Sequence, residues 1–313
     1  MTKTLCALAV GATAMLLGAA TARADTTLAT GLAPTVKVSM RGGAIAWSAP
    51  AAGGRWKLVI ARGGVAADAA VRLARVPFDV DLGDDGRGHL IATYSRCSRP
   101  PRGLERPRGC DVYRYDVTAR RERRVPGLGA GAASDYLPTA AGGRIAFSRS
   151  VAGGPARLYW RTLSGGPLHR LRGGLANADD RTGPRSLDLG RRGLAIAWVA
   201  RGPAGPGLDY GGQEVRFDPL DAAPKLLARY TQGDISGTDV VGVTATATGV
   251  LWGAQGNGEN DKTMLYLLPQ LTQSSDSREL TFPIASASGD SLAHAVVLTQ
   301  DGSVVLLDSG GSS

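Results

Sequence analysis

Residues that serve most enzymes as nucleophiles, bases and metal ligands are scarce in this sequence. Its 313 residues include three cysteines and three histidines, and His89, His169 and His294 lie far apart along the chain. It contains no His-Glu-x-x-His motif, phosphate-binding glycine loop, Ser-His-Asp arrangement or sialidase-type Asp box. These absences argue against hydrolysis by a histidine-activated nucleophile. They leave open chemistry that carboxylates or a bound cation could perform.

Long apolar runs are also missing, except near the N-terminus. Lys3 precedes the apolar run 4–17, and Ala22-Arg23-Ala24 forms a small-x-small cleavage pattern. The run is shorter than the ~20 residues of a membrane-spanning helix. The pattern therefore predicts a secretory signal peptide over residues 1–24 rather than a membrane anchor. We expect an exported chain, secreted or periplasmic, that begins at Asp25.

Lysine supplies only five of the 36 basic residues. Such an arginine bias, together with abundant alanine and glycine, is typical of a GC-rich genome. Without Lys3 and Arg23 the formal net charge falls from +9 to +7. Because an exported protein rarely meets nucleic acid, we expect no nucleic-acid partner despite the basic pI. Attraction to acidic glycans or lipid headgroups stays open.

Glycine is abundant, with 44 residues, and short apolar segments recur between glycine-rich turns. Six copies of one apolar strand are centred on Ile45, Ile91, Ile145, Ile196, Leu251 and Val296. The steps between them are 46, 54, 51, 55 and 45 residues. A repeat of this length indicates one supersecondary unit used six times.

Each copy is preceded by one short strand pattern and followed by up to two more. We expect first strands at 36–38, 80–82, 136–138, 187–189, 241–243 and 284–286, and fourth strands at 71–73, 123–125, 168–171, 225–227 and 278–280. The sixth copy lacks a fourth strand, which residues 26–29 could supply. Four antiparallel strands per unit predict an all-β, six-bladed β-propeller over residues 25–313, closed by the N-terminal strand.

Part of the second copy resembles the repeats of TolB-type β-propellers. The run 84–95 (DDGRGHLIATYS), continued by 110–116 (CDVYRYD), is similar to their Asp-Gly-x-x-Ile-Ala-Phe-x-Ser and Asp-Ile-Tyr-x-x-Asp phrases. Weaker copies occur at 45–48 and 143–148. The resemblance implies a propeller that binds ligands or proteins. The α/β domain that precedes the propeller in TolB has no counterpart, so the resemblance does not extend to TolB's translocation function.

Two cysteines remain after residue 24, Cys97 and Cys110, and in an oxidising compartment they predict a disulfide. The bond would close an arginine-rich loop that contains Arg99, Arg102, Arg106 and Arg108 but one acidic residue. The neighbouring predicted strand adds four arginines between 120 and 124. The loop predicts a site for an anionic partner, and the alternative is a solvated basic loop that the disulfide protects from proteolysis.

Two further polar loops are expected on the same propeller face as the channel mouth. One spans 201–212 and contains Asp209 and Tyr210, which we predict to be binding residues. The other spans 253–262 and is rich in Asn, Asp and Glu. Loops on a rigid scaffold are common places for function.

Three aspartates, Asp79, Asp135 and Asp239, precede the apolar strand of their copies by ten to twelve residues. At the start of an innermost strand they would surround the channel mouth, where they could bind Ca²⁺ or a cationic ligand. In the alternative, each stabilises a turn. The acidic run 79–85 is not an EF-hand, because Leu90 occupies the position that needs a glutamate.

The sequence therefore predicts a monomeric, exported propeller without catalytic activity that binds a protein or an anionic glycan through its channel-mouth face. The alternative is a Ca²⁺-dependent propeller enzyme that acts on a carbohydrate or a lactone.

Overall fold

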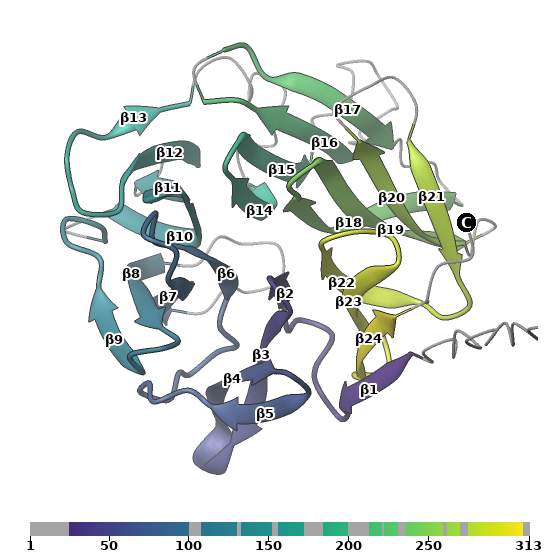
Figure 1. The fold of residues 1–313 in the computed structure, drawn as a ribbon, viewed down its shortest axis with the longest axis horizontal. Helices are drawn as coiled ribbons and strands as arrows, with labels where there is room; N and C mark the ends of the chain where they lie inside the picture. The colour runs from purple at the N-terminus through teal and green to yellow at the C-terminus, as the bar shows by residue number, and fades with distance from the viewer. Residues whose placement is uncertain are drawn as a thin grey trace, which may run out of the picture.

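The computed structural model describes residues 25–99, 108–129, 133–151, 156–171, 184–199, 213–220, 222–230, 236–258, 262–269 and 275–308. Its strands form six separate four-stranded antiparallel sheets, accompanied by the 3-10 helix η1 (Ala52–Gly54). Figure 1 shows the sheets as blades around a central axis. The predicted six-bladed propeller is confirmed. None of the described segments is a helix with the length and apolarity of a membrane span.

The first three blades follow one another along the chain, each in the order inner to outer strand. Blade 1 contains β2 (Val38–Arg41), β3 (Ala44–Ala51), β4 (Arg55–Arg62) and β5 (Val65–Asp68). Blade 2 contains β6 (Asp81–Asp84), β7 (Leu90–Arg99), β8 (Arg108–Asp116) and β9 (Arg121–Arg124). Blade 3 contains β10 (Ala133–Ala141), β11 (Arg144–Val151), β12 (Arg157–Thr162) and β13 (His169–Arg170).

The last three blades repeat this plan, and the ring closes in blade 6. Blade 4 contains β14 (Pro184–Gly190), β15 (Gly193–Val199), β16 (Gln213–Asp218) and β17 (Lys225–Tyr230). Blade 5 contains β18 (Ser236–Ala245), β19 (Gly249–Gly258), β20 (Thr263–Pro269) and β21 (Asp276–Leu280). Blade 6 contains β22 (Ile284–Gly289), β23 (His294–Thr299), β24 (Val304–Asp308) and, as its outer strand, β1 (Thr26–Ala29). Thr26 pairs with Leu306, so the predicted N-terminal closure is confirmed.

The second strand of each blade is buried at its centre, because its two faces pack against the neighbouring blades. The six predicted centres, from Ile45 to Val296, all lie on second strands and are at most 4% exposed. Burial on both faces explains why these strands are almost continuously apolar.

Blade 1 differs from the expected strand positions. Its outer strand is β5 rather than residues 71–73, and its inner strand begins at Val38 rather than Val36. The reason is the turn at Gly63 and Gly64, whose φ angles of 56° and 79° suit a two-residue hairpin directly after β4. The expected segment instead returns to β4, where Ala74 pairs with Trp56.

Short polar side chains join neighbouring blades at the inner strands. Each inner strand has an edge whose N–H groups find no partner in its own sheet. Hydroxyl or carboxylate oxygens of the preceding blade accept many of these bonds: Leu82 N donates to Ser39, Leu189 N to Thr139, Val243 N to Ser186, and Met40 N to Ser288. The Ser and Thr residues of the inner strands therefore satisfy backbone donors around the ring.

Candidate functional site

Inner strands of all six blades surround a narrow cavity on the propeller axis. Its volume is about 30 Å³, room for one or two water molecules. Its walls include Lys37, Asp81 and the serines Ser186, Ser286 and Ser288. A cavity of this size is too small for a sugar ring, so the described part of the axis is a polar core rather than a substrate channel.

Two basic side chains of blade 1 reach across the axis. Lys37 Nζ donates to the carbonyl oxygen of Arg185 at 2.5 Å. The Arg41 guanidinium donates to the carbonyls of Leu189 (2.9 Å) and Ala245 (3.2 Å). These acceptors belong to blades 4 and 5, so the two cations link opposite sides of the ring. Burial lowers the pKa of Lys37 to about 8, although two nearby aspartates oppose the shift.

Two aspartates lie beside these cations. Asp188 accepts hydrogen bonds from Ala245 N at 2.7 Å and Thr139 Oγ1 at 3.4 Å, and Asp81 accepts one from Ser39 Oγ at 3.0 Å. Burial raises the pKa of both carboxyl groups, and the charge of Asp188 raises that of Asp81 further. Lys37, Arg41, Asp81 and Asp188 are called the axial cluster below.

The aspartates predicted to bind Ca²⁺ are occupied by protein donors. Asp79 accepts bonds from Ser95 N and Ser95 Oγ at 2.6 Å and from Leu137 N at 2.7 Å. Asp135 is fully buried and forms a two-pronged ion pair with Arg149, at 2.6 and 2.7 Å. Each carboxylate therefore holds neighbouring strands together.

Asp239 is likewise hydrogen-bonded to Gln213 Nε2. Within the described ranges, no group of three or more Asp, Glu, His or Cys side chains is arranged to hold a metal ion. Ca²⁺ takes six to eight oxygen ligands, whereas these three carboxylates face protein donors. They do not fit a shared calcium site, and the calcium prediction gains no support from their geometry.

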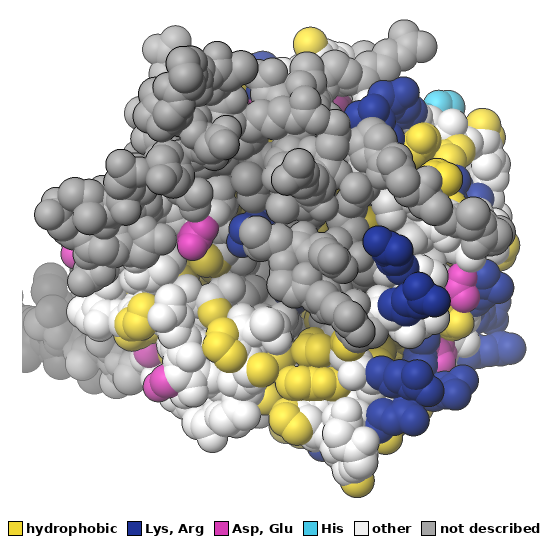
Figure 2. All heavy atoms as spheres, turned by 180° about the vertical axis from the view of Figure 1, so that it is seen from behind, with side chains coloured by type: hydrophobic (Ala, Val, Ile, Leu, Met, Phe, Trp, Pro, Cys, Tyr) yellow, Lys and Arg dark blue, Asp and Glu magenta, His cyan; other side chains and the backbone are white. Residues whose placement is uncertain are grey.

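Blade 2 carries a group of exposed arginines without acidic partners. Residues 96–124 contain ten arginines against four acidic residues, whereas residues 231–308 contain two basic residues against nine acidic ones. In Figure 2, basic side chains gather along the side that holds blade 2. Six exposed or half-exposed arginines form no ion pair within the described ranges: Arg99, Arg108, Arg114, Arg120, Arg121 and Arg123. We call these six the arginine surface.

The strand register of blade 2 places like charges opposite one another. Arg99 on β7 is directly opposite Arg108 on β8, and Arg114 on β8 is directly opposite Arg123 on β9. Side chains two residues apart on a strand point to the same face of the sheet. These arginines therefore lie on the same face as Val112 and Val125, which pack toward blade 3. This face therefore has two positive pairs beside one mixed pair, Asp116 with Arg121.

Two other arginines of blade 2 form ion pairs with acidic side chains. Arg96 forms an ion pair with Glu122, and its guanidinium lies 5.0 Å from the ring centre of Tyr113. Arg124 binds Asp111 at 2.7 Å. These side chains have structural partners, in contrast to the arginine surface.

The predicted disulfide joins Cys97 to Cys110, which are directly opposite on β7 and β8. Arg99 and Arg108 each lie two residues from the bonded cysteines on the loop side, at the base of the predicted closed loop. The other predicted binding residues, Arg102, Arg106, Asp209 and Tyr210, lie outside the described residues.

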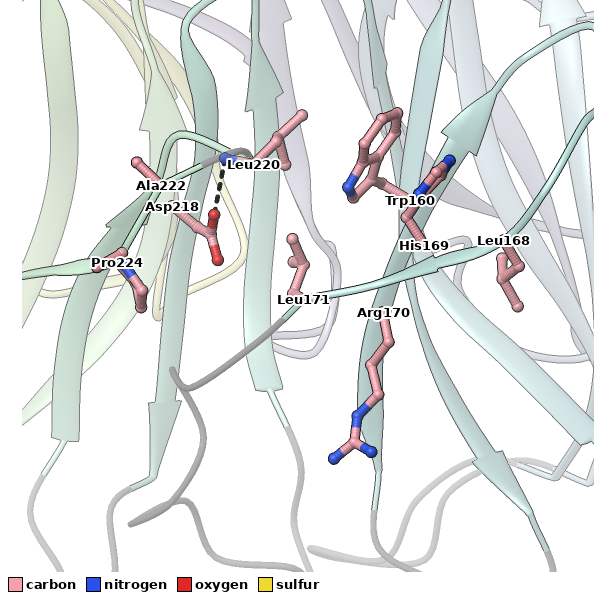
Figure 3. A pocket seen from close by; sticks show the side chains of 10 residues that line it. Trp160, Leu168, His169, Arg170, Leu171, Asp218, Leu220, Ala222 and Pro224 are labelled. Atoms are coloured by element: carbon pink, nitrogen blue, oxygen red, sulfur yellow. Dashed lines mark hydrogen bonds between the residues drawn. The ribbon is translucent and has the colours of Figure 1, made fainter.

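An open groove of about 940 Å³ separates the outer parts of blades 3 and 4. Figure 3 shows Leu171 pointing between Trp160 and Leu220, while Arg170 points away from them. The rings of Trp160 and His169 stack 4.4 Å apart. His169 thus packs on an aromatic ring, and the groove has an apolar floor without converging charged groups.

The sequence did not reveal the axial cluster. Arg41 contacts residues 148 and 204 positions away, and no local spacing indicates such a contact. The sequence held one indication of this cluster. The acidic residue Asp188 is flanked by two leucines on a predicted inner strand.

Comparisons with known proteins support the fold. No protein-family model and no curated protein matches this chain. The GH93 α-L-arabinofuranosidase of Fusarium graminearum is 12% identical, with 88% of this chain and 93% of that chain covered and a TM-score of 0.51. The SapL1 lectin, solved with α-methyl fucoside, is 9% identical, with 91% and 99% covered and a TM-score of 0.51.

TolB from Acinetobacter baumannii is 12% identical, with 86% of this chain and 53% of that chain covered and a TM-score of 0.47. This chain therefore spans about half the length of TolB. At such identities the similarity shows a shared propeller fold alone. No family model matches the chain, so the resemblance of the repeats to the TolB type stays a prediction.

Proposed function

We propose that this chain is an exported binding protein for an anionic glycan, and that the arginine surface is its binding site. The observation that carries the proposal is the like-charged pairing of Arg99 with Arg108 and of Arg114 with Arg123. Like charges directly opposite destabilise a sheet, by ~0.2–1 kcal/mol for pairs of this kind. An anionic ligand between them would remove that cost.

The spacing of these arginines favours an extended ligand. Arg108 and Arg114 lie on the same face of β8 and are six residues apart, a distance of about 20 Å at ~3.4 Å per residue. A single small anion cannot contact both. The planar guanidinium forks of arginine suit carboxylate, sulfate and phosphate groups, which they bind with paired hydrogen bonds.

A glycan fits this surface better than an acidic protein. Protein interfaces are centred on buried aromatic or aliphatic anchors. The exposed large apolar side chains in the described ranges are Val65, Leu73, Val151, Leu168 and Leu226. None of them lies on a strand of blade 2. The SapL1 lectin supports the proposal only as an example of a propeller with a bound saccharide.

Export is part of the proposal. The Cys97–Cys110 disulfide is the kind of bond that forms and persists in an oxidising compartment. The predicted signal peptide would deliver the chain to such a compartment, where cell-envelope glycans are found.

The test is calorimetric titration of residues 25–313 with an oligogalacturonate about ten sugars long. The variant Arg108→Glu, Arg114→Glu, Arg123→Glu should bind at least about 30-fold more weakly, because phosphate- or carboxylate-type contacts are charge-assisted. The matched control reverses three exposed arginines of blade 1 and its connection, Arg62, Arg72 and Arg75. It has the same net charge and should lose less than about threefold. Equal losses in both variants would show attraction by net charge alone and refute a defined site.

The alternative function, a Ca²⁺-dependent enzyme acting on a carbohydrate or lactone, stays a prediction. No described side chain favours it. A shift in Tm on addition of Ca²⁺ or a chelator would revive it.

A further inference from the structure

We propose that Arg99 and Arg108 form a binding site for a phosphate monoester group. The inference rests on the proposed function and specifies one end of its ligand: the anionic polymer would carry a phosphate monoester that binds at the disulfide end of the arginine surface. Three features of the β7–β8 hairpin lead to it.

The first feature is the close approach of the two strands. Cys97 and Cys110 are directly opposite, with 3.9 Å between their Cα atoms. Arg99 and Arg108 are the next opposite pair on the same face. Closely and widely spaced pairs alternate along an antiparallel ladder, so pairs two residues apart are of the same kind. The Cβ atoms of directly opposite residues lie about 4.5–5.5 Å apart. Both guanidinium groups can therefore reach the same phosphate group.

The second feature is a rigid backbone beneath both side chains. The disulfide fixes the strands, and Ser98 Oγ donates to the carbonyl oxygen of Arg108 at 3.4 Å. Gly109 has a φ of +62°, and a Cβ there would lie 2.2 Å from Ser98 Oγ. The positive φ and this contact both favour glycine here. Because these contacts hold both arginines near each other before binding, the ordering cost on association is reduced.

The third feature is the charge of the pair. Both side chains are exposed, and neither has an acidic partner within the described ranges. Two guanidinium groups carry two positive charges. A phosphate monoester carries about 1.5 to 2 negative charges at pH 7, whereas a carboxylate carries one and would leave one arginine uncompensated. The pair therefore selects phosphate over carboxylate.

The experiment compares glucose 1-phosphate with glucuronate by calorimetric titration of residues 25–313. Glucose 1-phosphate should bind at least about tenfold more tightly, since it can accept paired hydrogen bonds from both arginines. The variant Arg99→Gln, Arg108→Gln should lose that preference. The matched control Arg62→Gln, Arg75→Gln, which removes the same charge from exposed positions outside the arginine surface, should keep it.

A second variant, Cys97→Ala with Cys110→Ala, tests the role of the disulfide. It should weaken glucose 1-phosphate binding about three- to tenfold while circular dichroism shows the fold retained. If this variant does not fold, the arginine variants still decide the proposal. Vesicles of phosphatidylcholine with phosphatidic acid supply the same group on a lipid, and tighter binding to them than to glucose 1-phosphate would identify a lipid source.

The two proposals fail in distinguishable ways. Oligogalacturonate binding without any preference for glucose 1-phosphate overturns the phosphate site and leaves the glycan-binding function. Phosphate preference that survives Arg99→Gln, Arg108→Gln overturns the location. Phosphate binding without oligogalacturonate binding overturns the glycan-binding function but keeps the site.

Discussion

The axis and the rim of this propeller use charge in opposite ways. At the axis, the cations Lys37 and Arg41 lie beside the carboxylates of Asp81 and Asp188, and all four side chains form hydrogen bonds to other blades. On the rim of blade 2, six arginines form no ion pair within the described ranges. Both regions are rich in charge, yet only the second has charge available to a ligand.

The difference separates structural charges from binding charges. A charge that bridges blades over a long sequence distance contributes to folding, and its removal should act on stability. A charge that faces a like charge slightly destabilises the fold, and its removal should weaken binding without loss of stability. The following variants test this division.

The largest expected effect is at the axis. Arg41→Ala removes a cation that bonds to two carbonyl groups and leaves Asp81 and Asp188 without their main counter-charge. Each buried carbonyl that loses its donor costs about 1–3 kcal/mol of unfolding free energy, and the weakened compensation of the two carboxylates adds to this cost. Urea unfolding of Arg41→Ala against Arg120→Ala, an exposed arginine of the rim, measures the contrast. A loss below about 1 kcal/mol at Arg41 would mean that the axial cluster is not structural.

The next effect concerns the bond that fixes the rim. Reducing Cys97–Cys110, or replacing both residues by alanine, should lower the unfolding free energy by about 3 kcal/mol on the chain-entropy model. Thermal unfolding with and without a dithiol reductant measures it, and the double alanine variant, which has no bond to reduce, is the control. Equal Tm values for the oxidised and reduced protein would contradict the expectation.

The same contrast explains what the sequence could predict. The blades were predictable because Ile45, Ile91 and their four counterparts repeat a local pattern, and Cys97–Cys110 because the chain offers one pairing after residue 24. The outer strand of blade 1 was misplaced because two glycines permit an earlier turn. Local patterns carry this information.

The candidate sites were predictable only where the residues are near in sequence. Arg99 and Arg108 were found because one loop contains them. The axial cluster was not, since Arg41 and Asp188 meet only after the ring closes. The aspartates 79, 135 and 239 were expected to converge, but Asp135 binds Arg149 within its own blade. The spacing of aspartates in a sequence does not show which hydrogen-bond donor each carboxylate will bind in the folded protein.

A smaller effect at the axis depends on pH. Because the pKa of Asp81 is raised above its ordinary value of 3.8, its contribution favours folding at low pH and is lost as the pH rises through the raised pKa. Asp81→Asn cannot ionise. It should be more stable than the native chain at pH 7 by at least about 1 kcal/mol, roughly the free energy of a tenfold change in proton affinity. Near pH 3 the two chains should be equally stable.

Asp85→Asn is the control, because the pKa of Asp85 is shifted in the opposite direction from that of Asp81. Hydrogen bonds from Arg87 N and His89 lower the pKa of Asp85, although partial burial opposes them. Its contribution is present above the ordinary pKa and is lost as the pH falls, so Asp85→Asn should be less stable at pH 7 and converge with the native chain in acid. Urea unfolding at pH 3, 5 and 7 compares the two. Destabilisation by Asp81→Asn at pH 7 would refute the raised pKa.

The smallest effect lies on the rim and tests the observation behind the proposed function. Arg123 faces Arg114 across β8 and β9, whereas Arg121, on the same strand and the same face, is opposite Asp116. Arg123→Thr should therefore raise the unfolding free energy by ~0.2–1 kcal/mol, and Arg121→Thr should lower it by a similar amount. Both should weaken oligogalacturonate binding. A residue that costs stability and supports binding is selected for the ligand, because folding alone would remove it. If the two variants changed stability in the same direction, the like-charged register would not be the cause, and the glycan-binding proposal would lose the observation on which it stands.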